Sequence, residues 1–291
     1  MSVNQRGAVP LIRGLRQKKG YGPFLLIPLV AALAACDVHL GNLSARATDE
    51  WTRSYPLKAG GEVRIVNTNG KIDVEGIDGS TVEVRAERIA RGATDAAARE
   101  LLPRIVIKED ATPERVSLET ERIRGIMIGA AFEVRYHVRS PKHAVVNVTN
   151  TNGQVVLTGL TGKVSAHTTN GGVKGDGLTG GLDARSTNGL VSIDLVSVGS
   201  DRITLHTTNG GVTLTLPETA KADLSASVTN GGISVGDFQN IEVAEKSRRH
   251  LEAKLNGGGA PIELQTTNGG VRIRPRNSVA DTRTTDERKD R

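Results

Sequence analysis

The stretch VSAHTTNGGVKGDGLTGGLDARSTNGLVSIDL, residues 164–195, decides the fold of this chain because it contains one short unit twice. Each unit is an alternating run of residues, the tripeptide Thr-Asn-Gly, and a second alternating run. The tripeptide occurs seven times in the 291 residues, with asparagines at Asn69, Asn152, Asn170, Asn188, Asn209, Asn230 and Asn268. A repeat of this length predicts a repeat architecture before any single residue is considered.

The residues around each tripeptide alternate between apolar and polar with a period of two. A β-branched residue stands three positions after every asparagine: Ile72, Val155, Val173, Val191, Val212, Ile233 and Val271. An apolar residue stands six positions before it, and the positions between are mostly polar. This alternation is typical of strands with one buried face. Each unit therefore predicts a strand, a turn and a second strand.

The spacing of the units selects one arrangement of these strands. Asn-Gly favours turns because both residues tolerate a positive φ angle, which alone would suggest hairpins. From Asn152 to Asn230, however, the asparagines are 18, 18, 21 and 21 residues apart, and so short a unit cannot bury its own apolar face. We therefore predict an all-β, single-stranded parallel β-solenoid of about 18–21 residues per rung, with rungs about 4.8 Å apart. The seven asparagines would form a ladder of amides at one corner, and the threonines before them a second ladder.

Two intervals interrupt the rhythm, from Asn69 to Asn152 and from Asn230 to Asn268. The first contains strand-like runs and one short helix, expected over Thr94–Leu102 with Thr94 or Asp95 as its N-cap. We interpret both intervals as decorated or degenerate rungs of one domain over residues 61–275. The polar, mixed-charge residues 276–291 predict a disordered tail.

The N-terminus predicts a cellular address. Residues 1–35 carry five basic and no acidic residues and an apolar run that ends Leu33-Ala34-Ala35-Cys36. This pattern is typical of a secretory signal, and the run is short for a membrane-spanning helix. Leu-Ala-Ala-Cys resembles the lipobox of bacterial lipoproteins, which implies a signal peptide over residues 1–35, lipidation (such as palmitate) of Cys36, and a tether over residues 36–60. The resemblance places the protein in the bacterial cell envelope, facing the periplasm or the surface, and Asp37 weakly favours the inner membrane.

Charge and composition narrow the partners. The formal net charge of +6 falls to +1 once the five charges of the signal peptide are removed, which argues against a nucleic-acid partner. After the signal, the aromatic residues are Trp51, Tyr55, Phe132, Tyr136 and Phe238. So few aromatics argue against a dedicated glycan groove, because such grooves rely on aromatic platforms.

From Thr52 to Pro275 the chain resembles the bacterial "putative adhesin" family of unknown function, which is related to the head GIN domain. The resemblance is carried by GEVRIVNTNG over residues 61–70, by the later Thr-Asn-Gly strands, and by Arg135-Tyr136-His137-Val138 before Pro141. It implies a β-solenoid displayed at the cell envelope and supplies no catalytic residues.

Two outer columns carry groups with possible chemistry. Asp176 and Asp194 lie six residues after their asparagines on adjacent rungs, so their carboxylates could bind Ca²⁺ or act as an acid–base pair. We favour an ordinary surface position for both. His167, Arg185 and His206 share another column, but the two histidines are two rungs apart, about 9.6 Å by the strand spacing, too far to share Zn²⁺. We expect no metal, no cofactor and a structural role for the asparagines.

The sequence thus favours a lipid-anchored, non-enzymatic scaffold or adhesin-like interaction surface, whose partner is a membrane through its anchor and an envelope protein or glycan. One alternative is an envelope polysaccharide-binding or polysaccharide-degrading β-helix. Another is a self-assembling envelope element that stacks through its open rungs.

Overall fold

The computed structural model describes residues 44–121 and 129–276, all of which belong to one compact unit, Leu40–Arg291. The predicted signal peptide over residues 1–35, Cys36, Asp37 and residues 277–291 of the predicted tail lie outside the described residues. No helix within the described ranges is long and apolar enough to cross a membrane.

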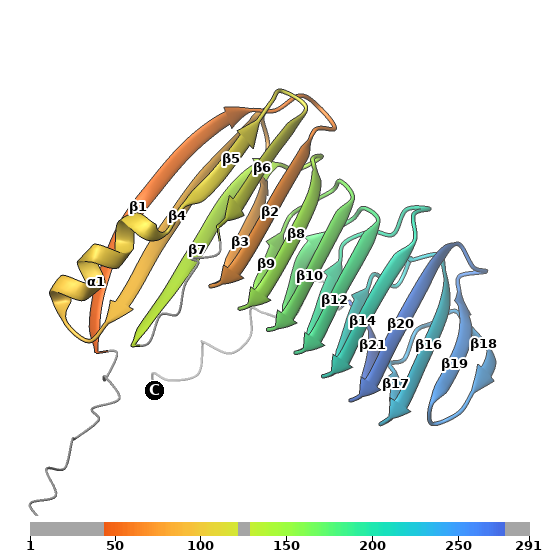
Figure 1. Cartoon of the computed structure of the whole chain (residues 1–291). Helices are drawn as coiled ribbons and strands as arrows, with labels where there is room; N and C mark the ends of the chain where they lie inside the picture. Colours follow the sequence, from red (N-terminus) through yellow and green to blue (C-terminus); the bar gives the residue numbers. More distant parts are fainter. Residues whose placement is uncertain (1–43, 122–128, 277–291) are drawn as a thin grey trace, which may run out of the picture. The chain divides into compact units, whose positions relative to one another are not determined.

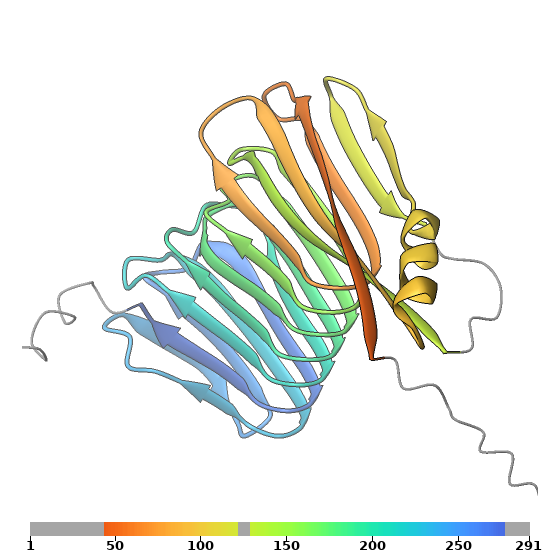
Figure 2. The ribbon, with the colours of Figure 1, turned by 90° about the vertical axis from the view of Figure 1, so that its left-hand side faces the viewer.

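Among the described residues, two sheets face each other (Figures 1 and 2). Sheet A runs in spatial order through β1 (Ala45–Pro56), β4 (Thr81–Gly92), β7 (Ala130–Pro141), β3 (Ile72–Ile77), β9 (Val155–Thr158), β11 (Val173–Leu178), β13 (Val191–Leu195), β15 (Val212–Leu216), β21 (Val271–Pro275) and β17 (Ile233–Val235). Sheet B runs through β18 (Ile241–Lys246), β19 (His250–Leu255), β16 (Ala222–Asn230), β20 (Ala260–Asn268), β14 (Ile203–Asn209), β12 (Leu182–Asn188), β10 (Val164–Asn170), β8 (Val145–Asn152), β2 (Glu62–Asn69), β6 (Arg115–Thr120) and β5 (Ile107–Ala111).

Each repeat contributes one strand to each sheet, with Thr-Asn-Gly at the corner between them. Strands β10 and β12 pair in parallel with Val164 opposite Leu182 and Asn170 opposite Asn188, and β11 pairs in parallel with β13. Inward residues such as Val164 and Leu182 are at most 3% exposed, so apolar columns fill the space between the sheets. Burial of each such side chain stabilises the fold by about 1.5–3 kcal/mol. The predicted parallel β-solenoid is confirmed.

The corners use glycine for two reasons: Gly70, Gly153, Gly231 and Gly269 have positive φ angles, whereas Gly171, Gly189 and Gly210 do not. None of the seven asparagines has a positive φ angle, since the described non-glycine residue with one is Asn256 (φ 48°). Gly210 needs no positive φ either, but a Cβ on it would lie 2.1 Å from the carbonyl oxygen of Gly189 in the neighbouring rung. The stacked corners approach so closely that a side chain has no room there.

The rungs do not follow the sequence order at the C-terminal end. Strand β14 pairs with β20, and β20 pairs in turn with β16, so the last repeat lies between the two repeats before it. The interval between β16 and β20 forms β18 and β19, which pair in antiparallel fashion with each other and with β16. This interval is therefore a hairpin at the end of sheet B, which is a decoration of the stack and not a degenerate rung.

The first interval extends the other end of the stack. Strands β6 and β7 continue the parallel pairing beyond β2 and β3, which makes one additional rung. Strands β5, β4 and β1 then pair in antiparallel fashion. Helix α1 (Asp95–Leu101) begins after Thr94, whose side chain accepts a hydrogen bond from the Ala97 amide, and the 3₁₀ helix η1 (Leu102–Arg104) follows.

Part of the predicted tether belongs to the folded domain. Residues 45–56, which the sequence places in the tether over residues 36–60, form β1 and pair with β4 along their whole length. This segment is ordered because Ala47 and Tyr55 point inward and are each only 9% exposed. Their burial offsets the entropy cost of ordering the strand. The predicted tail loses its first residue in the same way, because Arg276 contacts two strands of sheet A.

Candidate functional site

The seven asparagines form one chain of six side-chain hydrogen bonds along the corner. Each amide nitrogen donates to the Oδ1 atom of the preceding rung at 2.7–2.9 Å, in the order Asn230, Asn268, Asn209, Asn188, Asn170, Asn152 and Asn69. Most of these side chains are exposed, so the ladder is a surface feature and not the buried stack typical of solenoids. Its two ends differ: among the described residues, the amide nitrogen of Asn69 and the side-chain oxygen of Asn230 have no hydrogen-bond partner.

A second polar column lies inside the corner, two residues before every asparagine of the ladder except Asn230, where the position holds Val228. Four hydroxyls donate to a glycine carbonyl of the neighbouring rung at 2.7–3.1 Å: those of Thr168, Ser186, Thr207 and Thr266. Asn150 does the same with its amide, bonding the carbonyl of Gly70 at 2.8 Å. The expected ladder of threonines directly before the asparagines is wrong, since the bonded column is the inward one. Its signal was present in the sequence, because small polar residues interrupt the apolar columns there.

The speculative acidic pair is out of register. Gly175 lies opposite Ile193, but the next partners are Leu178 and Leu195, so a bulge in β11 falls where Asp176 would meet Asp194. The carboxylate of Asp194 instead pairs with the guanidinium group of Arg276 at 2.8 Å. Partial burial raises the pKa of Asp194, Arg276 opposes that shift, and the charge of Asp176 adds to it. The charge of Asp176 thus affects the pKa of Asp194, although the ion-pair partner of Asp194 is Arg276.

The histidine column is in register, as Arg185 lies opposite His167 on one side and His206 on the other. Asp183 holds the Arg185 guanidinium with two hydrogen bonds of 2.7 and 3.0 Å, and its other contact is His167 at 3.7 Å. The guanidinium group of Arg185, which lies between the two histidines, is therefore held in place by the Asp183 carboxylate. Within the described residues, no group of three or more His, Cys, Asp and Glu side chains is placed to hold a metal ion.

A candidate site lies on the solvent-facing side of sheet A, where the antiparallel strands meet the parallel stack. A hollow of about 530 Å³ is lined there by residues of β1, β4, β7, β3 and β9. Its charged lining consists of Asp73, Glu75, Glu83, Arg85 and Arg139, with His137, Thr52 and Thr158 beside them. Short threonine side chains among long charged ones leave the space that forms the hollow.

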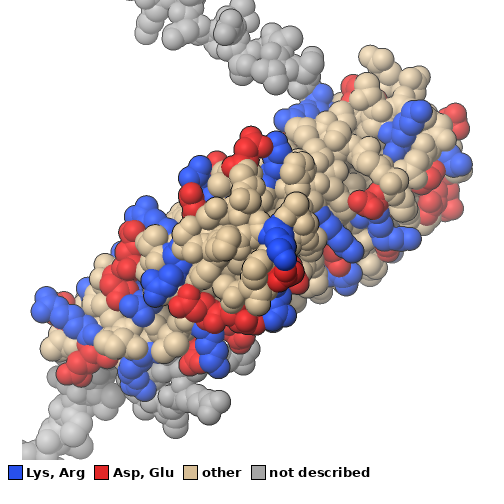
Figure 3. All heavy atoms as spheres, turned by 90° about the horizontal axis from the view of Figure 1, so that it is seen from above, with Lys and Arg blue, Asp and Glu red and all other residues tan. Residues whose placement is uncertain are grey.

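The charges around this hollow are paired loosely. Arg139 donates to Glu83 at 2.8 Å and lies 3.8 Å from Glu75, while Asp73 contacts Lys71 at 2.7 Å. The Arg139 side chain is 54% exposed, and such exposed pairs contribute only about 0–1 kcal/mol each. A partner could therefore exchange these pairs for its own charges at little cost. Figure 3 shows the same interspersion of basic and acidic side chains on a face seen from above.

The sequence could not have found this hollow. Its residues come from five strands, and three of those strands belong to the interval that lacks the repeat or to the predicted tether. Charged residues at alternate strand positions predict only a solvated face.

Comparison with known proteins adds a family. A family model described as Toastrack DUF4097 matches residues 132–274, and no curated protein matches the sequence. Among solved structures, a "putative cell adhesion protein" from Clostridium sporogenes is 10% identical, with 79% of this chain and 100% of that chain covered and a TM-score of 0.40. A "putative adhesin" from Bacteroides fragilis is 10% identical, with 78% and 97% covered and a TM-score of 0.28. Another from Parabacteroides merdae is 11% identical, with 79% and 97% covered and a TM-score of 0.28.

The family match agrees with the resemblance that the repeats carry, and it spans strands β7 to β21, which include six of the seven Thr-Asn-Gly corners. Residues 132–274 of this chain therefore form a Toastrack DUF4097 domain.

Proposed function

We propose that this protein is a lipid-anchored component of the bacterial cell envelope that acts as a non-enzymatic interaction scaffold. The anchor is Cys36, and the body is a rigid solenoid that presents the hollow around Arg139 to an envelope partner. The observation that carries the proposal is this hollow of about 530 Å³, which both signs of charge line. It suits a protein segment that itself carries both charges, because the exposed pairs can be exchanged across an interface.

The arrangement of the two candidate carboxylates, Asp176 and Asp194, supports a non-enzymatic role. The carboxylate of Asp194 is engaged by Arg276, and the bulge in β11 displaces Asp176 from its register position. A retaining or inverting pair of carboxylates needs both groups to face one substrate across a defined gap. Turnover of an envelope glycan by the full chain would overturn this part of the proposal.

The anchor is tested by fractionation of cells that express the full chain or its Cys36→Ala variant. We expect the wild-type chain to sediment with membranes and to incorporate labelled palmitate. The variant should do neither, since the acyl chains supply the membrane affinity at about 0.8 kcal/mol per buried CH₂. Unchanged membrane association of the variant would contradict the lipid anchor at Cys36. It would not affect the proposal that the hollow around Arg139 binds a partner.

The scaffold is tested by cross-linking in intact envelopes with a charge-swapped chain. The double variant Glu83→Arg, Arg139→Glu keeps the internal ion pair and reverses the pattern that a partner meets. We expect it to lose the cross-linked species of the wild-type chain, while the matched swap of the Asp183 and Arg185 pair on sheet B retains them. If both swaps retain the same species, the hollow is not the contact surface.

Self-assembly is a second candidate, because β17 ends sheet A and, among the strands that the structure describes, pairs only with β21. The edge is short, and the amide of Ile233 already donates to the carbonyl of Arg248 at 3.1 Å. An edge of three residues that is partly covered offers little to a second copy. Light scattering of the full chain in detergent, over a range of concentrations, tests this candidate, and concentration-dependent oligomers would favour it.

A further inference from the structure

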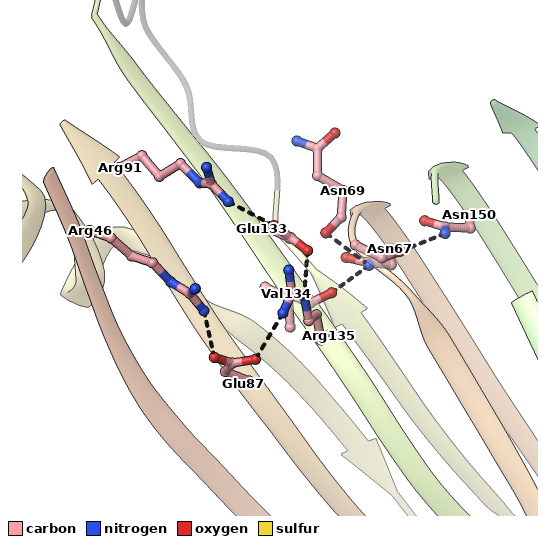
Figure 4. A network of polar contacts seen from close by, with 10 residues as sticks. Arg46, Asn67, Asn69, Glu87, Arg91, Glu133, Val134, Arg135 and Asn150 are labelled. Atoms are coloured by element: carbon pink, nitrogen blue, oxygen red, sulfur yellow. Dashed lines mark hydrogen bonds and ion pairs between the residues drawn. The ribbon is translucent and has the colours of Figure 1, made fainter. Parts of the chain in front are cut away.

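The asparagine ladder ends in a second, smaller hollow. Asn69 occupies the last rung of the ladder, and its amide nitrogen has no partner among the described residues. A hollow of about 150 Å³ lies beside it, lined by Asn69, Ile89, Arg91, Ala131, Phe132 and Glu133 among others. Figure 4 shows Asn69 at the end of β2, in the same region as Glu133 of β7 and Arg91 of β4. The unused donor of the ladder is therefore available at a concave site.

The ladder strengthens this donor. Six amide hydrogen bonds run in one direction, each nitrogen donating towards the rung of Asn69. Hydrogen bonds in a chain polarise one another, which makes the terminal N–H group a stronger donor than an isolated amide. A hydrogen-bond acceptor is the group that this end of the ladder would bind.

The charges beside the hollow favour an anionic acceptor. Arg46, Glu87, Arg135, Glu133 and Arg91 form a chain of alternating ion pairs across β1, β4 and β7 (Figure 4), with three cations and two anions. Glu133 accepts a hydrogen bond of 2.6 Å from Arg135 but lies 4.0 Å from Arg91. Arg135 therefore balances the charge of Glu133, and Arg91 is the cation of this network that is held most loosely.

Size and lining limit the rest of the ligand. A volume of about 150 Å³ corresponds to about five water molecules, enough for a carboxylate and the few atoms next to it. Phe132 and the buried side chain of Ile89 give the hollow an apolar part. Arginine binds a carboxylate through two parallel hydrogen bonds, and the Asn69 amide can add a third.

We propose that the hollow between Asn69, Arg91 and Phe132 binds a single carboxylate group of a ligand. The site lies outside the hollow around Arg139, and its existence does not depend on the envelope location or on the proposed scaffold role. The carboxylate could belong to a sugar acid or to the C-terminus of a peptide, and both offer the same group to Arg91.

The proposal is tested on the full chain in detergent by NMR titration of the Asn69 side-chain amide. Sodium acetate is the probe and acetamide is its neutral counterpart. We expect a saturable shift with acetate, with a Kd on the order of 1–10 mM for so few atoms, and no saturable shift with acetamide. Absence of saturation with acetate, or equal binding of acetamide, would overturn the proposal.

Matched variants locate the site. Arg91→Gln should weaken acetate binding roughly 10- to 100-fold, as expected for loss of a hydrogen bond to a charged group, whereas Arg46→Gln at the other end of the ion-pair chain should not. Asn69→Ala, followed through the backbone amide of Gly70, should weaken binding several-fold, and Asn230→Ala at the opposite end of the ladder should not. Equal losses in both members of either pair would contradict the assignment. Glucuronate represents a sugar acid, and N-acetylalanine represents the C-terminus of a peptide. The one that resembles the natural ligand should bind more tightly than acetate.

Discussion

The side-chain amide of Asn268 donates a hydrogen bond of 2.7 Å to Oδ1 of Asn209, although 59 residues separate the two in sequence. Asn230, which lies between them in sequence, bonds to the far side of Asn268 at 2.8 Å. The last repeat is thus inserted between two earlier ones, and strand β20 has a parallel partner on each side. The chain therefore skips one rung after β14 and β15, and the last repeat, β20 and β21, occupies it.

Engineered disulfides test this order. Neighbouring rungs are about 4.8 Å apart, which suits a disulfide, while alternate rungs are about 9.6 Å apart, which does not. In a Cys36→Ser background, Cys substitutions at Asn209 and Asn268 should cross-link on mild oxidation. Substitutions at Asn209 and Asn230 should remain free thiols. Peptide mapping by mass spectrometry reads the outcome, and efficient cross-linking of the second pair would show that the rungs follow the sequence order.

The close stacking of the corners makes a second prediction. Gly210→Ala should lower the free energy of unfolding by about 3 kcal/mol, because the new Cβ would lie 2.1 Å from the Gly189 carbonyl oxygen and force the rungs apart. Gly199→Ala is the matched control, as a Cβ there meets nothing within 4 Å. It should change stability by no more than about 0.5 kcal/mol. Urea unfolding followed by circular dichroism measures both, and equal effects would contradict this account of the corner glycine.

The part of the structure that could be predicted from the sequence is the part that the repeats build. The period of two and the spacing of Asn152, Asn170 and Asn188 are local features, so the parallel stack and its apolar columns follow from them. The inserted last rung is a choice between partners with nearly identical edges. Strands β14, β16 and β20 all carry apolar residues at the same positions, so alternation alone cannot rank their pairings.

The candidate sites were less predictable for a different reason. The bulge that separates Asp176 from Asp194 involves Gly177, which has a left-handed conformation (φ 67°). Because several glycines lie nearby in the sequence, the sequence does not indicate which of them forms a bulge. Arg276 follows the last strand and looks like the start of a polar tail, yet its amide donates to the carbonyl of Leu216 at 2.6 Å. Both hollows form between strands that are distant in sequence, and period-two patterns carry no information about which strands meet.

A buried phenol predicts alkaline sensitivity. Burial raises the pKa of Tyr136 from 10.0 to about 12, and its hydroxyl shares a hydrogen bond of 2.8 Å with Thr120. Because the folded state binds the proton more tightly, this contribution is complete below pH 10 and is lost as the pH rises from 10 to 12. The loss amounts to about 3 kcal/mol at most.

Tyr136→Phe separates this titration from other alkaline effects. At pH values near 8 the variant should be less stable by about 1 kcal/mol, because the Thr120 hydroxyl loses its partner. Above about pH 11 the difference should shrink or reverse, since only the wild-type chain has a phenol to ionise at position 136, whereas Tyr55 is present in both chains. Urea unfolding at both pH values measures the two free energies. A constant difference between the chains would exclude a contribution of Tyr136 to the pH dependence.

Asp194 offers the sharpest test of the acidic pair, because its two charged neighbours act in opposite directions. Burial raises the pKa of this carboxyl group, Arg276 lowers it, and Asp176 raises it. Arg276→Gln should therefore raise the pKa of Asp194 further, and Asp176→Asn should lower it. Since the folded-state pKa lies above the unfolded value, the stability contribution of Asp194 is complete at low pH and is lost as the pH rises through the folded-state pKa. Carboxyl ¹³C NMR titration follows the group directly. Opposite shifts in the two variants would fit a carboxylate held by an arginine, whereas a pKa that ignores Arg276 and responds only to Asp176 would restore the acid–base pair as a candidate.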